Sequence, residues 1–138
     1  MAFTRIVRTL ADGGTFTVFG TGEQTRDVTY VADAVAGTVS AMENGRSGRI
    51  YNIGGGSETS LRQAISACEQ LSGRVLDVRH EPAATGDVRR TAADTRLANR
   101  ELDWEPRVSL DEGLHAQVMW GIQVAGTAVE SLSAAGPH

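Results

Sequence analysis

The feature that most constrains this chain is an extended apolar run that passes through three glycines into a helical pattern. The run "RIYNIGGG" at 49–56 is followed by "SETSLRQAISACEQLSG", in which apolar residues recur at the spacing of one helix face. Ser60 and Gln63 have the spacing of a capping box, and Gly73 stands at the expected helix end. A strand that leads directly into a helix predicts an α/β fold, with the glycines as a tight strand-to-helix turn.

Other periodic segments extend this interpretation. Residues 3–10 have one apolar face and precede Gly13, which predicts the end of a helix. "TFTVFG" and "RVLDVRHEP" predict strands, and "TRDVTY" predicts a further extended piece. Residues 31–44 place apolar side chains at helical spacing, so this helix is expected to need a packing partner. Two more helices are expected, one with Asp94 as its N-cap and one that starts with a capping box at 109–112.

Composition argues against several classes of partner. The chain has 138 residues, about one domain, of which 41% are hydrophobic and 22% charged, so one compact unit is expected. A net charge of −4 is unfavourable for binding duplex nucleic acid, which requires a basic surface. No apolar run approaches the roughly 20 residues that span a bilayer. Neither a nucleic-acid partner nor a membrane partner is therefore expected.

The use of lysine and cysteine limits the chemistry further. All 13 positive charges are arginine, which excludes a catalytic lysine within this chain. The only cysteine, Cys68, falls on the apolar face of its helix, where a free thiol is expected to be a core residue. One cysteine cannot form an internal disulfide, which agrees with a reducing compartment, and the cytoplasm is the expected location.

The spacing of other residues does not indicate a cofactor, metal or nucleophile site. The glycines at 54–56 lack the last glycine of the dinucleotide fingerprint, so no NAD-binding loop is expected in this chain. His80, His115 and His138 are too far apart in sequence to predict a metal site. No serine stands in a nucleophile elbow, and no catalytic residue is assigned.

The stretch "GTGEQTRDVTY" at 20–30 is a candidate binding site. Gly20 and Gly22 allow the backbone to bend closely, and the planar guanidinium of Arg26 suits a bidentate contact with phosphate. The same residues also allow a surface ion pair of Arg26 with Asp27 or Glu23. From the residues alone, both interpretations stay open.

Three segments in order resemble one enzyme family. They are "FTVFGTGEQTRDVTYVADAVAGTVSAM", "GRIYNIGGGSETSLRQAI" and "GDVRRTAADTRLANRELDWEPRVSLDEGL". From residue 1 to about 122 they resemble the C-terminal half of an extended short-chain dehydrogenase/reductase, in particular the NAD-dependent epimerase/dehydratase family that acts on nucleotide sugars. The residues Gln-Thr-Arg-Asp at 24–27 are more similar to epimerase and decarboxylase members than to dehydratases.

The resemblance implies a fold and its boundaries. Residues 1–125 are expected to form the C-terminal substrate-binding portion of an extended short-chain dehydrogenase/reductase, an α/β fold with the last Rossmann strand and helices. The cofactor-binding half is expected to be absent. Residues 126–138 are expected to form a flexible tail, because they are small and polar.

The resemblance also implies which residues bind substrate. It places the pyrophosphate of a nucleotide-diphosphate sugar on Arg26 and the nucleotide or its phosphates near Asn52, and it places Arg89 at the border of the same site. Family members commonly carry an arginine where this chain has Ala84. Phosphate affinity is therefore expected to be weaker, unless Arg89 or Arg90 substitutes.

Three further residues of the first motif are implied to be scaffold. Asp27, Tyr30 and Asp33 are expected to fix the loop and to cap the helix that follows.

The expected function follows from what the chain resembles and what it lacks. It has neither the G-x-x-G-x-x-G loop nor the Tyr-x-x-x-Lys pair of the family, and Met1 corresponds to an interior position of longer relatives, so a truncated, catalytically incomplete chain is expected. Full-length members use NAD for hydride transfer at a sugar carbon. The alternative is a non-catalytic interaction or assembly module that binds no nucleotide. A homodimer is expected, because "RIYNIG" would leave an unpaired edge and the helix at 31–44 an uncovered apolar face.

Overall fold

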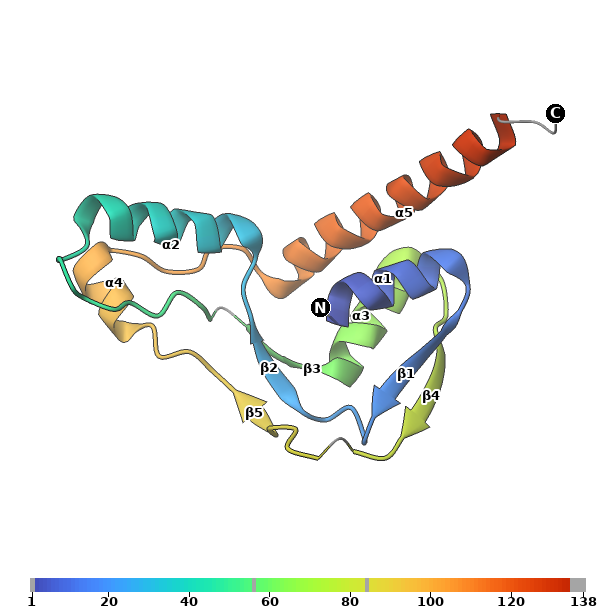
Figure 1. The fold of residues 1–138 in the computed structure, drawn as a ribbon, viewed down its shortest axis with the longest axis horizontal. Helices are drawn as coiled ribbons and strands as arrows, with labels where there is room; N and C mark the ends of the chain where they lie inside the picture. Colours follow the sequence, from blue (N-terminus) through green and yellow to red (C-terminus); the bar gives the residue numbers. More distant parts are fainter. Residues whose placement is uncertain (1, 56, 84, 135–138) are drawn as a thin grey trace. The chain divides into compact units, whose positions relative to one another are not determined.

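The computed structural model describes residues 2–55, 57–83 and 85–134, in which helices and strands are mixed along the chain (Figure 1). This mixture confirms the predicted α/β class. In chain order the elements are α1 (Ala2–Asp12), β1 (Thr15–Phe19), β2 (Thr25–Val28), α2 (Val31–Asn44), β3 (Ser57–Ser60), α3 (Leu61–Ser72), β4 (Asp77–Glu81), β5 (Arg90–Thr91), α4 (Arg96–Leu102) and α5 (Leu110–Ala134).

The elements form two compact units, where chain length alone predicted one. Unit 1 contains Met1–Gly22, Leu61–Thr85 and Leu114–His138, and unit 2 contains Glu23–Ser60 and Gly86–Gly113. Each unit buries apolar residues of its own. Chain length cannot predict this division, because it bounds the total buried surface and says nothing of how many cores share it.

Unit 1 is built on a parallel pair of strands. β1 and β4 pair in register from Thr15 with Asp77 to Phe19 with Glu81, and α1 packs on α3. The strand predictions for both segments are confirmed. The helix ends are also confirmed, since Gly13 and Gly73 adopt positive φ angles of 75° and 66° that suit a C-terminal glycine. The buried apolar side chains of the unit are Ile6, Val7, Leu10, Phe16, Val18, Ala64, Ile65, Cys68, Leu76, Leu114 and Val118.

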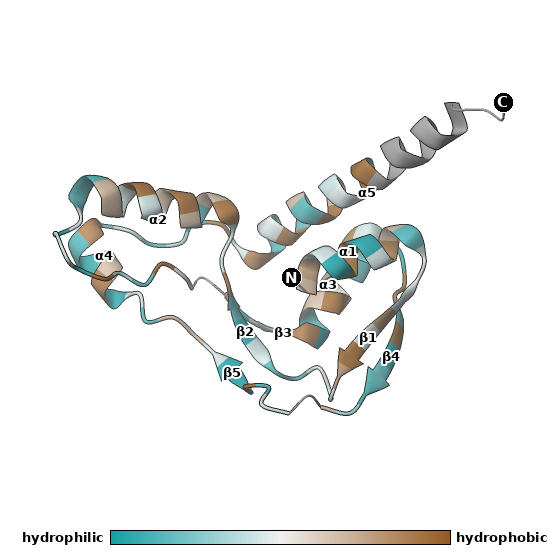
Figure 2. Cartoon of the chain, viewed as in Figure 1, coloured by the Kyte–Doolittle hydropathy of each residue, from teal (hydrophilic) through white to brown (hydrophobic). Residues whose placement is uncertain are grey.

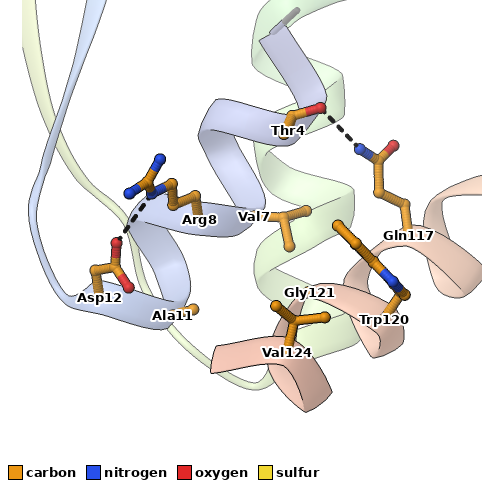
Figure 3. Close-up of a pocket in the computed structure, with 9 residues that line it drawn as sticks. All are labelled: Thr4, Val7, Arg8, Ala11, Asp12, Gln117, Trp120, Gly121 and Val124. Carbon is orange, nitrogen blue, oxygen red and sulfur yellow. Dashed lines mark hydrogen bonds and ion pairs between the residues drawn. The ribbon is translucent and has the colours of Figure 1, made fainter. Parts of the chain in front are cut away.

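A pocket of about 350 Å³ lies in unit 1 between α1 and α5 (Figure 3). Val7 and Ala11 of α1 face Trp120 and Val124 of α5 across it. A Cβ atom on Gly121 would overlap Cγ1 of Val7, so the packing of the two helices depends on glycine at this position.

Unit 2 contains a three-stranded sheet in the order β3-β2-β5. β2 pairs antiparallel with β3 and parallel with β5. α2 packs on α4, and the core consists of Ala98, Leu102 and Trp104 with partly buried Ala41, Tyr51 and Ile53. The indole Nε1 of Trp104 donates a 3.1 Å hydrogen bond to the backbone oxygen of Asp33. This bond ties the end of α4 to the first turn of α2.

The apolar stripe of α2 is exposed, as the sequence predicted. Figure 2 colours much of this helix toward the hydrophobic end of the scale. The buried residues of α2 are Asp33 and Gly37, which lie on the face toward the core of unit 2. Gly37 is buried because a side chain there would collide with Ile53 and Trp104. The exposed members of the stripe are Val31 (67% exposed), Val35 (56%), Val39 (40%) and Met42 (77%).

The predicted strand at "RIYNIG" is wrong. Residues 49–55 form no strand, and the short strand β3 begins only at Ser57. A strand requires a neighbour for its backbone hydrogen bonds, and no described strand pairs with 49–55. The glycines at 54–56 therefore lead into β3 and form no direct strand-to-helix turn; Gly56 itself lies outside the described residues.

The helix starts agree with the predicted caps in one case and differ in another. Ser109 and Glu112 form the predicted capping box, with the Ser109 N–H donating to Glu112 Oε2 at 2.9 Å and the Glu112 N–H to Ser109 Oγ at 3.3 Å. The hydroxyl of Ser109 also bonds the Glu112 carboxylate and lowers its pKa. The N-cap of α4 is Thr95, one residue after the predicted Asp94.

The C-terminal residues are described only in part. α5 continues as helix to Ala134, and the final four residues of the expected tail at 126–138 lie outside the described part of the chain, as does His138. Within the described residues, none of the helices combines the length and the apolar character needed to cross a membrane.

Candidate functional site

The predicted site residues all fall in unit 2, around strands β2 and β5. Arg26 lies on β2 and is paired with Thr59 of β3 on one side and Thr91 of β5 on the other. Arg89 immediately precedes β5, and its backbone oxygen accepts a 2.9 Å hydrogen bond from the Thr25 N–H. The parallel pairing of β2 and β5 thus joins the "QTRD" and "GDVRR" segments, which are 60 residues apart in the sequence.

The guanidinium of Arg26 is held by three acceptors. Its Nη1 donates to the backbone oxygens of Thr25 at 2.8 Å and Val88 at 2.7 Å. Its Nη2 donates to Oδ1 of Asp87 at 2.5 Å, which makes an ion pair. The ion-pair interpretation from the sequence is therefore correct in kind, but the carboxylate belongs to Asp87 and to neither Asp27 nor Glu23.

Asp87 also contacts a second residue of the same motif. The side-chain amide of Gln24 donates to the other carboxylate oxygen of Asp87 at 3.3 Å. Gln24 and Arg26 are two residues apart on an extended chain, so their side chains point to the same side. One carboxylate thereby links two residues of the first motif to the loop before β5.

Arg90 does not share a face of the sheet with Arg26. Arg90 is paired with Thr25, and successive residues of a strand point to opposite faces. Its guanidinium is bound to Glu58 of β3, with Nε to Oε2 at 2.8 Å and Nη2 to Oε1 at 2.5 Å. The hydrogen bonds from Arg90 lower the pKa of Glu58. Of the two arginines that could replace a missing phosphate ligand, this geometry favours Arg89.

Arg89 has an exposed side chain. Its guanidinium makes no hydrogen bond or ion pair with any residue in the part of the chain that the structure describes. Ala84, the position at which relatives commonly carry arginine, lies outside the described residues.

Asn52 is connected to the same region through the loop after β5. Its side-chain Nδ2 donates a 3.2 Å hydrogen bond to the backbone oxygen of Asp94. Asp94 follows three residues after Thr91, the partner of Arg26. The carboxylate of Asp94 accepts from the backbone N–H and the guanidinium of Arg96, and these bonds lower its pKa to about 2. Asp94 therefore stays ionised and supports the start of α4.

Asp27 has the scaffold role that was expected. Its Oδ2 accepts a 2.7 Å hydrogen bond from the backbone N–H of Ala93, which fixes the loop after β5 against β2. Gly54 lies beside this bond, where an added Cβ would come within 2.9 Å of the Ala93 side chain. The other oxygen, Oδ1, is buried and has no hydrogen-bond partner among the described residues. This carboxylate holds the loops with Asn52 and Asp94 near Arg26.

Asp33 and Tyr30 are also scaffold, although Asp33 does not cap α2 as expected. Asp33 Oδ2 accepts a 2.9 Å hydrogen bond from the Val108 N–H and so fixes the segment between α4 and α5. Tyr30 is the N-cap residue of α2, without a side-chain capping bond. Its ring lies against Gly113, where a Cβ would be 3.0 Å from the ring.

The structure adds one functional residue that the sequence analysis missed. Asp87 was seen only as part of the "GD" pair, yet it is the ionic partner of Arg26. Its place beside an arginine 61 residues earlier depends on the pairing of β2 with the two-residue strand β5. The described residues contain no cluster of three or more histidine, cysteine or acidic side chains placed to hold a metal. The α1–α5 pocket contains none of the predicted site residues.

Comparison with known proteins agrees with this arrangement. The family profile described as GDP-mannose 4,6 dehydratase matches residues 2–117. A UDP-glucuronate 4-epimerase of Thermodesulfobacterium geofontis is 33% identical over 121 residues, which are 87% of this chain and 37% of the relative. A dTDP-glucose 4,6-dehydratase of Streptomyces griseus is 34% identical over 117 residues, 84% of this chain and 36% of the relative.

Solved structures give the same result. The UDP-glucuronic acid 4-epimerase of Bacillus cereus, in complex with UDP-glucuronic acid and NAD, superposes with a TM-score of 0.84 at 36% identity and is matched over 90% of this chain and 40% of that chain. The UDP-glucose 4-epimerase of Thermotoga maritima with UDP-glucose gives a TM-score of 0.83 at 32% identity, with coverage of 90% and 40%. The chain thus spans about 40% of the length of these relatives, and it belongs to the NAD-dependent nucleotide-sugar epimerase and dehydratase family of extended short-chain dehydrogenases/reductases.

Proposed function

We propose that this chain is the part of a nucleotide-sugar epimerase or dehydratase that binds the nucleotide-diphosphate sugar. The observation that supports it most is the junction of β2 with β5, which brings the "QTRD" and "GDVRR" segments together around the guanidinium of Arg26. The matched structures of relatives contain UDP-glucuronic acid or UDP-glucose. A diphosphate is the part of such ligands that an arginine recognises best.

The chemistry of Arg26 fits this role. A guanidinium carries five N–H donors, and the contacts to Thr25, Val88 and Asp87 use three of them. Nε–H and one N–H of Nη2 have no partner among the described residues and can donate to phosphate oxygens. The exposed Arg89 supplies a second positive charge, and Asn52 supplies a neutral donor and acceptor to the nucleotide.

Within a whole enzyme this portion would position the sugar, and the chain by itself would be inactive. Fixing the diphosphate limits where the sugar can lie, which lowers the entropic cost of meeting a cofactor. Full-length relatives are described with NAD bound, and this chain would contribute no NAD-binding residue and no catalytic residue. The one free cysteine, buried in unit 1, suits a reducing compartment, so a cytoplasmic location belongs to the proposal.

The proposal is tested by titrating the purified chain with UDP in a calorimeter. A dissociation constant on the order of 0.1–1 mM is expected, because one phosphate ligand is replaced by Ala84 and the loops must be ordered on binding. Arg26→Ala should weaken binding by at least about tenfold, since it removes charge-assisted hydrogen bonds to the diphosphate.

Arg46→Ala is the matched control. Arg46 is an exposed arginine of the same unit, paired with Glu101 at 3.7 Å, and its removal changes the net charge by the same amount. UDP affinity should not change in this variant. Equal losses in the two variants would show that general charge governs binding, and loss only in Arg89→Ala would move the phosphate contact to Arg89.

A second candidate function is favoured by the exposed stripe of α2, which suits an interaction or assembly module. The partner that we propose is a second copy of the chain. A twofold dimer needs a surface that can meet itself, and one straight aliphatic stripe on a helix satisfies this condition. This homodimer is compatible with nucleotide binding, and only a failure to bind UDP would leave assembly as the sole function.

A further inference from the structure

Asp87 occupies the place at Arg26 that an anionic ligand would take. Carboxylate and phosphate oxygens are both preferred acceptors of a guanidinium. The Asp87 carboxylate lies 2.5 Å from Nη2 of Arg26, and the two side chains are 34% and 38% exposed, so solvent and ligands can reach the pair. In the described structure, the positive charge of the main predicted phosphate contact is therefore already compensated by a residue of the same chain.

The position of Arg26 does not depend on Asp87 alone. The backbone oxygens of Thr25 and Val88 hold Nη1 at 2.8 and 2.7 Å. These carbonyls are neutral, so they fix the guanidinium without compensating its charge. Removal of the Asp87 charge should leave the guanidinium in place with a stronger attraction for anions.

The partners of Asp87 also indicate that its charge, more than its shape, opposes ligand binding. Gln24 donates to Asp87 Oδ2 at 3.3 Å, and Arg26 donates to Oδ1. An asparagine has the same shape as aspartate and retains one acceptor for Arg26. The amide of Gln24 can turn over to accept from the new NH₂ group. A neutral side chain can thus preserve the link between β2 and the loop.

We infer that Asp87 is a built-in competitor of the nucleotide diphosphate: it neutralises Arg26 in the free chain and must yield the guanidinium, or share it, when phosphate binds. The inference rests on the proposed function and adds to it a residue that sets affinity. Because Asp87 repels phosphates as well as occupying Arg26, it reduces binding of any anion that cannot displace it. A diphosphate, with two charged groups, displaces it more readily than a monoanion does.

The test compares UDP and inorganic pyrophosphate binding to the intact chain and to Asp87→Asn by calorimetry at low salt. Asp87→Asn should bind both ligands about three- to tenfold more tightly, and the gain should shrink as salt screens the charges. Asp87→Glu, which keeps the charge, should retain the weak binding of the original chain. Circular dichroism checks folding, and Asp87→Ser carries the same expectation should the asparagine variant not fold.

Glu58→Gln is the matched control. Glu58 is also a carboxylate bound to an arginine in the same sheet, but its partner Arg90 points to the opposite face from Arg26. Its removal alters net charge equally and should leave UDP affinity unchanged. An equal gain in Glu58→Gln would contradict a local role of Asp87.

The outcomes separate this inference from the function on which it rests. Tighter binding in Asp87→Asn alone supports both. Binding by the original chain that is unchanged or weaker in Asp87→Asn overturns the inference and leaves the proposed function intact, since Asp87 would then position Arg26 or contact the ligand. Absence of binding in every variant, for UDP and for pyrophosphate, overturns both.

Discussion

Cys68 is the residue whose chemistry is most altered by its surroundings. Its side chain has no exposed surface, and burial raises the pKa of its thiol to about 11, with a smaller contribution from the charge of Glu69. The thiolate is the reactive form of cysteine, so a raised pKa and complete burial both suppress reaction. Cys68 thus belongs to the core of unit 1, as its place on the apolar face of α3 predicted.

The reactivity of Cys68 gives a direct test of this packing. From the shift in pKa alone, the native chain at pH 8 should contain about 100-fold less thiolate than an unfolded chain, because each pKa unit is a factor of ten. Iodoacetamide should therefore modify native Cys68 at least that much more slowly than the same residue in urea. Labelling at the unfolded rate without denaturant would place Cys68 outside the core.

At the residue scale the sequence predicts side-chain types better than their partners. Arg26 could be selected because guanidinium chemistry and the glycines around it suit phosphate. Its ionic partner could not be selected, because Asp87 is distant in sequence and β5 is only two residues long. Asp33 was assigned to a helix cap for the same reason: its true partner, the Val108 N–H, is 75 residues away. Local rules describe neighbours along the chain and do not cover such contacts.

At the scale of elements, helical periodicity identified α2 correctly but could not say what covers it. The stripe led by Val31, Val35 and Met42 is more than half exposed at each of these positions, and the helix buries Asp33 and Gly37 instead. A pattern of apolar residues predicts a face that needs burial, and the partner that buries it need not be in the same chain. The loss of a strand at 49–55 has a related cause, because an extended segment becomes a strand only beside another strand.

Self-association through α2 is tested by adding one charge to the stripe. Val35→Glu should convert a dimer at about 50 µM to a monomer in sedimentation experiments, because burying an unpaired carboxylate in an interface costs several kcal/mol. The free energy of unfolding should change little, since Val35 is already 56% exposed.

Val75→Glu is the control for that experiment. Val75 is 88% exposed and lies in the loop between α3 and β4, so the same chemical change falls off the stripe. It should leave the dimer intact. A monomeric original chain, or equal dissociation in both variants, would show that α2 is not the interface.

At the scale of the whole molecule, the division into two units assigns the predicted chemistry to one of them. Arg26, Asn52, Asp87 and Arg89 all belong to unit 2, whereas unit 1 carries the buried cysteine and the α1–α5 pocket. The α/β class and the family were accessible from the sequence, because both depend on ordered local motifs. The two-unit organisation was not, because it follows from contacts between segments far apart in the chain.

The most direct test of the central claim is a titration of the ¹⁵N-labelled chain with UDP-glucose, followed by nuclear magnetic resonance. Weak binding in fast exchange is expected, on the order of 0.1–1 mM. Chemical-shift changes should be concentrated at Arg26, Asn52 and Arg89, including the Nε–H of Arg26, and addition of NAD to the same sample should produce none. An absence of shifts up to about 10 mM ligand, roughly ten times the weakest expected dissociation constant, or shifts that avoid these three residues, would contradict the assignment of this chain as the substrate-binding part of the enzyme.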